Sequence, residues 1–263
     1  MLSKLLKYDL KYMLQNMLVF YIFAIFFGLT TRILFSLNQT FMVSILSQVS
    51  VGCMFAMIVN IIINTVMRSW VRFKDFIYGD ESYLTHTLPV TKNDIYNSKF
   101  VQTIIFSVIG FIVIIGSLFI AYYTFDRWLL LKDFINSIST GLNINTMLFV
   151  ISIIVIFFLE ILNTIQSGFL GIILGHNKNN NKIGFSVLYG FISYLLSQGV
   201  VLLLIFILGL FNNNIMELFK SSMILDNDTI QLLIIFAILV YLLIIWIMNL
   251  ICKYKFNIGV NVE

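Results

Sequence analysis

Residues 104–123, IIFSVIGFIVIIGSLFIAYY, form a run of twenty amino acids without a charged side chain. A helix of about 20 apolar residues spans the hydrocarbon core of a bilayer, because each residue advances the helix by about 1.5 Å. A transmembrane β-strand would instead alternate apolar and polar residues over about 10 positions. The continuous run therefore predicts a membrane-spanning helix and excludes a barrel.

The whole chain has the composition of an integral membrane protein. Of its 263 residues, 60% are hydrophobic and 11% are charged, whereas soluble domains have about 45–50% apolar and about 25% charged residues. We expect an all-α integral membrane fold and a single transmembrane domain over residues 1–263. Six segments are long and apolar enough to span: 17–38, 43–67, 98–124, 146–174, 184–211 and 229–251.

The positions of lysine and arginine predict the orientation. The amino terminus, the loops after the second and fourth spans and the carboxyl tail hold most of the 16 basic residues, whereas the opposite side holds Arg127, Lys132 and Lys220. By the positive-inside rule both termini are cytoplasmic. Topology thus accounts for the net charge of +4, and we expect no nucleic-acid partner. The basic residues on the predicted cytoplasmic side are Lys4, Lys7, Lys11, Arg68, Arg72, Lys74, Lys92, Lys99, Lys178, Lys182, Lys253 and Lys255.

Residues 1–16 have the pattern of an amphipathic helix. Leucine and methionine recur at helical spacing, and Lys4, Lys7 and Lys11 fall on the other side. Such a helix lies in the membrane interface with its lysines toward anionic headgroups. The alternative is a basic flank that is merely helical. The apolar stripe consists of Leu2, Leu5, Leu6, Leu10, Met13 and Leu14.

Polar residues inside the predicted spans are candidates for a functional site, because a charge at the centre of a membrane is costly. Glu160 lies near mid-depth of the fourth span, and Asn60 and Asn64 lie one helical turn apart in the second. Packing between helices is the alternative role to a substrate or proton site. The predicted intramembrane polar cluster contains Arg32, Asn60, Asn64, Glu160, Asn163 and Gln166.

Small residues recur along the fifth span. They allow helix backbones to approach closely, so the segment predicts a helix–helix interface, either within one subunit or between two. The residues concerned are Gly184, Ser186, Gly190, Ser193, Ser197 and Gly199.

The sequence lacks the motifs of an enzyme or a nucleotide-binding protein. It contains no G-x-x-x-x-G-K-[ST] phosphate loop, and His86 and His176 have no cysteine or carboxylate neighbours at metal-ligand spacing. Cys53 and Cys252 form no paired motif and are interpreted as apolar filler. We therefore expect no catalytic activity and no cofactor bound by this chain.

The loop at residues 68–97 is longer than the 2–8 residues that commonly connect two helices. SWVRFKDFIY, residues 69–78, predicts a short helix that Gly79 ends by adopting a positive φ. Asp80 and Glu81 follow as an exposed acidic pair. YLTHTLPV, residues 83–90, is expected to be extended, because Pro89 disfavours helix before it. Thr91 with Asp94 resembles a capping box that starts the next helix.

Residues 76–90, FIYGDESYLTHTLPV, resemble the signature loop of bacterial ABC-2-type transporter permeases. The layout of an amino-terminal amphipathic helix and six spans is also similar to that family. The resemblance implies a dimeric permease in the bacterial plasma membrane, with ATP and Mg²⁺ held by a separate ATP-binding cassette ATPase that docks on this loop. The residues that it implies for ATPase coupling are Phe73, Asp75, Phe76, Tyr78, Asp80, Glu81 and Tyr83.

These features together favour the permease subunit of an exporter that moves an amphiphilic substrate, such as a peptide, an antimicrobial or a drug. Two alternatives remain at this level. One is an ATP-independent secondary transporter or channel that uses Glu160, and the other is a membrane sensor or scaffold that transports nothing. Either homodimers or heterodimers with a second permease fit the pattern.

Overall fold

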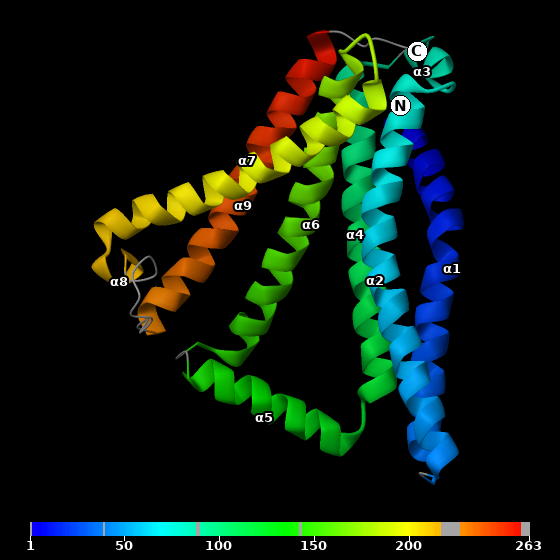
Figure 1. Ribbon diagram of the computed structural model, residues 1–263, viewed down its shortest axis with the longest axis vertical. Coiled ribbons are helices and arrows are strands. Elements are labelled where there is room, and N and C mark those ends of the chain that lie inside the picture. The colour runs from blue at the N-terminus through cyan, green and yellow to red at the C-terminus, as the bar shows by residue number, and fades with distance from the viewer. Residues whose placement is uncertain (1, 39, 88–89, 142–143, 217–226, 259–263) are drawn as a thin grey trace. The chain divides into compact units, whose positions relative to one another are not determined.

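The computed structural model describes residues 2–38, 40–87, 90–141, 144–216 and 227–258, and these residues are predominantly helical (Figure 1). Six helices are long and apolar enough to cross a membrane, which confirms the predicted multi-pass helical architecture. They are α1 (Leu2–Ser36), α2 (Phe41–Tyr78), α4 (Lys92–Tyr122), α6 (Thr146–His176), α7 (Lys182–Phe211) and α9 (Asn227–Ile258). Shorter helices are α3 (Ser82–Thr87), α5 (Phe125–Gly141) and α8 (Asn213–Met216).

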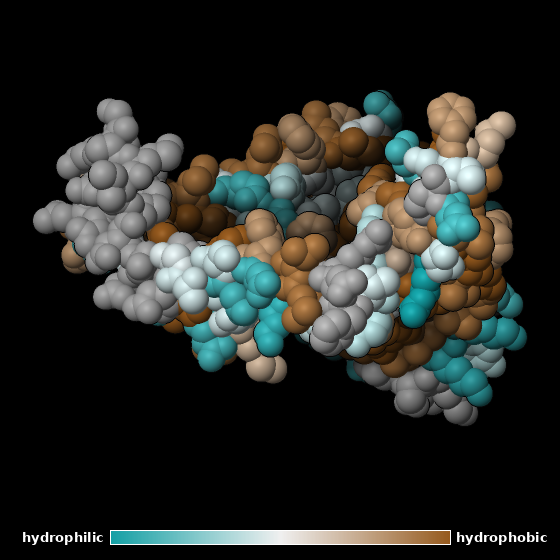
Figure 2. Space-filling model, turned by 90° about the horizontal axis from the view of Figure 1, so that it is seen from below, coloured by the Kyte–Doolittle hydropathy of each residue, from teal (hydrophilic) through white to brown (hydrophobic). Residues whose placement is uncertain are grey.

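Apolar side chains cover much of the outer surface of these helices. In Figure 2 brown apolar residues occupy most of the coloured surface, and hydrophilic residues form separate patches. Large side chains such as Ile112, Leu196 and Leu239 are more than half exposed in the middle of long helices. An exposed apolar surface of this kind is stable only against lipid or another protein.

The described chain divides into two compact units where the sequence predicts a single domain. Unit 1 contains Met1–Asp75 and Leu84–Leu131, and unit 2 contains Phe76–Tyr83 and Lys132–Glu263. The last residues of α2 therefore belong to unit 2, although the rest of that helix belongs to unit 1.

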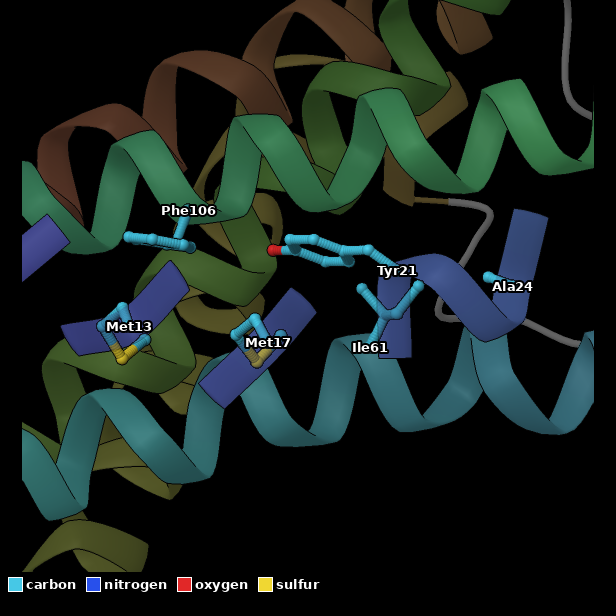
Figure 3. Close-up of a cluster of buried hydrophobic side chains, with 6 residues drawn as sticks. All are labelled: Met13, Met17, Tyr21, Ala24, Ile61 and Phe106. Atoms are coloured by element: carbon cyan, nitrogen blue, oxygen red, sulfur yellow. The ribbon is translucent and has the colours of Figure 1, made fainter. Parts of the chain in front are cut away.

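The core of unit 1 forms where α1, α2 and α4 meet. Met13, Met17 and Tyr21 of α1 point toward Ile61 of α2 and Phe106 of α4 (Figure 3). The repeat of four residues along α1 keeps these side chains on one face of the helix. Further along the helix, a Cβ atom on Gly28 would lie 2.9 Å from the carbonyl oxygen of Ser117, so α1 and α4 approach closely there.

The amino-terminal segment is continuous with the first long helix, so the structure does not confirm a separate interfacial helix at residues 1–16. No break separates residues 16 and 17 within α1. Asp9 and Met13 are buried on the same face as Met17 and Tyr21. The apolar stripe that predicted an interfacial helix is thus at least partly a packing face of unit 1.

In unit 2, α6 and α7 cross with almost no space between their backbones. A Cβ atom on Gly171 would overlap the backbone of Gly190, and one on Gly175 would overlap Ser186. The predicted small-residue interface in the fifth span is therefore confirmed for Ser186 and Gly190, and its partner lies within the same chain. Gly199 has open space around it and does not take part in this close approach.

The loop at residues 68–97 differs in part from its prediction. The helix at residues 69–78 is the end of α2, and Gly79 follows it without a positive φ. The prediction of an extended arm was wrong for residues 83–87, which belong to α3, because the effect of Pro89 on helix formation reaches only the residue before it. Residues 88–89 lie outside the described residues.

The predicted start of α4 is confirmed in that Thr91 caps the helix and bonds Asp94. The backbone N–H of Asp94 donates to Oγ1 of Thr91 at 3.2 Å, and the Thr91 hydroxyl donates to Oδ2 of Asp94 at 2.8 Å. Thr91 itself is extended, as an N-cap residue requires.

Candidate functional site

The strongest polar site of unit 2 is centred on Glu160 of α6. Its Oε1 accepts hydrogen bonds from the hydroxyl of Tyr194 at 2.8 Å and from Nε2 of Gln198 at 2.9 Å, both on α7. Tyr241 of α9 donates its hydroxyl to Oε1 of Gln198 at 3.4 Å. We call these four residues the Glu160 cluster. Three helices of unit 2 contribute to it, and all four side chains are partly exposed.

The second carboxylate oxygen of Glu160 has a different environment. Oε2 is shielded from solvent and has no hydrogen-bond partner among the described residues. An ionised carboxylate accepts several hydrogen bonds at each oxygen. The cluster therefore saturates one side of the carboxylate and leaves acceptor capacity on the other.

Two other predicted residues extend this polar line along α6. Asn163 and Gln166 are completely buried. Nδ2 of Asn163 donates to Oγ of Ser197 on α7 at 3.0 Å, which is an interhelical bond of the packing type. Neither amide atom of Gln166 has a hydrogen-bond partner among the described residues.

The remaining members of the predicted polar cluster lie in unit 1 and bond locally. Asn60 donates to the carbonyl of Ala56, and Asn64 donates to the carbonyl of Asn60, both within α2. Arg32 is exposed on α1. Within unit 2 the structure thus joins Glu160 to tyrosine and glutamine side chains.

Sequence inspection missed three members of the Glu160 cluster, namely Tyr194, Gln198 and Tyr241. A usable signal was present for two of them, because Tyr194 and Gln198 are one helical turn apart in the fifth span. Gln198 is also an uncharged polar residue deep in an apolar segment, as Asn60 and Asn64 are.

Unit 1 contains a buried ionic site that sequence inspection also missed. Oδ1 of Asp9 accepts from the guanidinium of Arg72 at 3.2 and 3.3 Å and from Nζ of Lys99. Asp9 is 1% exposed and Lys99 2%. The ring of Tyr12 lies against the guanidinium, with 4.4 Å between Cζ of Arg72 and the ring centroid. We call Asp9, Arg72 and Lys99 the Asp9 triad.

The residues implied for ATPase coupling divide into a buried group and an exposed group. Phe73, Phe76 and Tyr78 are buried, so their side chains are unavailable to a partner. Asp80, Glu81 and Tyr83 are exposed around the turn between α2 and α3, and Asp75 forms a partly exposed ion pair with Lys74 at 3.2 Å. The buried aromatic side chains can therefore position the exposed residues but cannot contact a partner themselves.

Tyr78 anchors this turn within unit 2. Its ring stacks on the imidazole of His176 at the end of α6, with 4.2 Å between ring centroids and 21° between planes. Nδ1 of His176 lies 2.9 Å from the carbonyl oxygen of Ile172, so that nitrogen carries a proton. The acidic turn therefore begins two residues after a buried contact with the helix that carries Glu160.

Within the described residues, the structure contains no group of three or more histidine, cysteine, aspartate or glutamate side chains placed to hold a metal ion. The comparisons with known proteins add no identity, because no protein-family model, no curated protein and no solved structure matches this chain.

Proposed function

We propose that this chain is the membrane-spanning permease subunit of an ATP-binding cassette exporter in a bacterial plasma membrane. A separate ATPase subunit binds ATP and Mg²⁺ and supplies the energy, and this chain carries no catalytic group. The observation that carries the proposal is the exposed acidic turn at Asp80 and Glu81, fixed at its base by the Tyr78–His176 stack. The resemblance of residues 76–90 to the permease signature loop supports the same function.

The proposed coupling is mechanical. An ATPase that pulls on the exposed turn moves Tyr78, and the stack passes this displacement to His176 of α6. Interiors are close-packed, so a displacement at one end of a helix reaches the side chains that this helix carries. The turn and the termini are then cytoplasmic, in agreement with the distribution of lysine and arginine.

Purification in mild detergent tests the proposal. The tagged chain should recover a stoichiometric P-loop ATPase from its native membrane, and the double reversal Asp80→Lys/Glu81→Lys should reduce that recovery about tenfold. Asp133→Lys is the matched control, because Asp133 is also exposed but lies on α5, in the predicted outer loop. Absence of an ATPase from the wild-type complex refutes the proposal. If the double reversal and Asp133→Lys recover the same amount of ATPase, the acidic turn is not part of the ATPase interface.

The Glu160 cluster favours a second candidate, an ATP-independent transporter that uses this carboxylate as a proton or ion site. A single ionisable residue in a membrane-spanning helix is often part of such a site. The purified chain in liposomes, without any ATPase, distinguishes the two. Ion flux driven by a gradient and abolished by Glu160→Gln supports this second candidate.

A further inference from the structure

The carboxylate of the Glu160 cluster has only neutral hydrogen-bond donors among the described residues. Its donors, the hydroxyl of Tyr194 and the amide of Gln198, are neutral. Among the described residues no lysine or arginine forms an ion pair with Glu160. A carboxylate removed from water is stable when it is paired with a cation, and one without a partner is costly. The structure therefore presents a negative group whose counter-charge does not come from the described chain.

The carboxylate also has unused hydrogen-bonding capacity for such a counter-charge. Oε2 of Glu160 is without a hydrogen-bond partner among the described residues, although its oxygen atom is shielded from solvent. The side chains of Tyr194, Gln198 and Tyr241 are partly exposed, so the cluster is reachable from outside. Tyrosine rings attract organic cations through their π faces.

The donor set fits an organic cation better than a metal ion. Calcium prefers six to eight oxygen ligands, usually from several carboxylates, and magnesium is usually held by one or two carboxylates with substrate phosphates and water. Here one carboxylate, two phenols and one amide converge. Large apolar side chains lie close to these residues in the sequence of the same helices, namely Phe191 and Leu195 of α7 and Leu242 of α9, and all are about half exposed or more. A charged head with an apolar tail matches this combination.

We propose that the Glu160 cluster binds the ammonium group of a cationic amphiphile, whose apolar part lies against the exposed faces of α7 and α9. The ammonium group approaches the carboxylate of Glu160 from the partly exposed side of the cluster and lies beside the rings of Tyr194 and Tyr241. As a statement about an exported substrate this inference rests on the proposed function, but the binding step belongs to this chain alone.

Equilibrium binding to the purified full chain in phosphatidylcholine nanodiscs tests the site. The probes are dodecylammonium and dodecanol, which share a chain and differ in charge. Dodecylammonium should bind saturably, and Glu160→Gln should weaken it at least tenfold, because hydrogen bonds to charged groups contribute about that much. Dodecanol should be insensitive to this variant. The control Asn60→Leu replaces an amide that donates to the carbonyl of Ala56 within α2, and it should leave both probes unchanged.

A second variant tests the site in case Glu160→Gln does not assemble well. Tyr194→Phe keeps the ring and removes only the hydroxyl bonded to Oε1. It should weaken dodecylammonium about threefold, because the carboxylate loses one of its fixed orienting contacts. Unchanged affinity in both variants overturns the proposal. The proposal is also overturned if dodecanol binds as tightly as dodecylammonium, because that result would indicate a purely apolar binding surface.

The two proposals fail separately. Binding that depends on Glu160 in a chain that recovers no ATPase supports the cationic site and refutes the exporter. If the chain recovers an ATPase but Glu160→Gln binds dodecylammonium as well as the wild type does, the exporter is supported and the cationic site is overturned. ATP-dependent loss of dodecylammonium from reconstituted vesicles, sensitive to Glu160→Gln, supports both.

Discussion

The Asp9 triad and the Glu160 cluster place the same chemical group, a carboxylate, in two opposite settings. Asp9 is almost fully buried and has two cations on one oxygen. Glu160 is partly exposed and has only neutral donors. In unit 1 the chain supplies its own counter-charge and closes the site. In unit 2 the chain orients the carboxylate of Glu160 with neutral donors and supplies no described counter-charge, which favours binding of a cationic ligand.

The difference follows from what each site holds together. The Asp9 triad connects α1, α2 and α4 through residues 63 and 90 positions apart from Asp9 in the sequence. The close crossing of α6 and α7 depends on glycine and serine instead. Small residues bring these two backbones into contact, and among the described residues no cation pairs with the nearby carboxylate.

The largest effect is expected for Asp9→Asn. This change removes the negative charge between two buried cations, and removal of one partner from a buried ionic group costs about 3–5 kcal/mol. The free energy of unfolding, measured by SDS titration in mixed micelles, should fall by that amount. Asp75→Asn is the control, because the exposed Asp75–Lys74 pair contributes about 0–1 kcal/mol. Equal losses in the two variants would contradict a structural role for the triad.

The Asp9 triad also shows what the sequence could and could not predict. The long helices follow from local composition, so their existence and approximate positions were predictable. Asp9 carried a signal of its own, because it lies four residues after Leu5 and four before Met13 and so interrupts an apolar stripe. Its partners carried none. Arg72 and Lys99 look like ordinary basic residues at the ends of spans, and only tertiary packing brings them to Asp9.

The same limit applied to Glu160. A carboxylate inside an apolar span was recognisable, but its hydrogen-bond partners depend on how α6, α7 and α9 pack. The crossing that brings α6 to α7 was half predictable. The small residues of the fifth span predict an interface, whereas its other half, Gly171 and Gly175 of α6, is not part of that prediction. A motif of small residues four apart in both segments was the available signal.

An intermediate effect is expected for Gly171→Ala. The new Cβ atom would meet the backbone of Gly190, which cannot rotate away, so α6 and α7 must separate. Overpacking of this kind costs about 1–3 kcal/mol. Gly116→Ala is the matched control in α4, because open space surrounds that position and alanine favours helix by up to about 1 kcal/mol. SDS titration measures both variants.

Gly171→Ala also connects packing to the Glu160 cluster. Glu160 lies on α6, and two of its partners lie on α7, so separation of these helices should weaken dodecylammonium binding. A variant that loses stability and keeps full binding would show that the cluster assembles independently of the crossing.

The smallest change in stability, and the sharpest comparison, is expected for Glu160→Gln. It is the same carboxylate-to-amide exchange as Asp9→Asn, yet no described cation loses a partner. The hydroxyl of Tyr194 and the amide of Gln198 can still donate to the amide oxygen of the new glutamine. Because the side chain is partly exposed and both neutral donors keep a hydrogen bond, the free energy of unfolding should change by less than about 1 kcal/mol. A loss of about 3–5 kcal/mol, as expected for Asp9→Asn, would mean that Glu160 also has a cation supplied by the protein. Glu160 would then be paired within the protein, as Asp9 is, and the reason for proposing a cationic ligand would be lost.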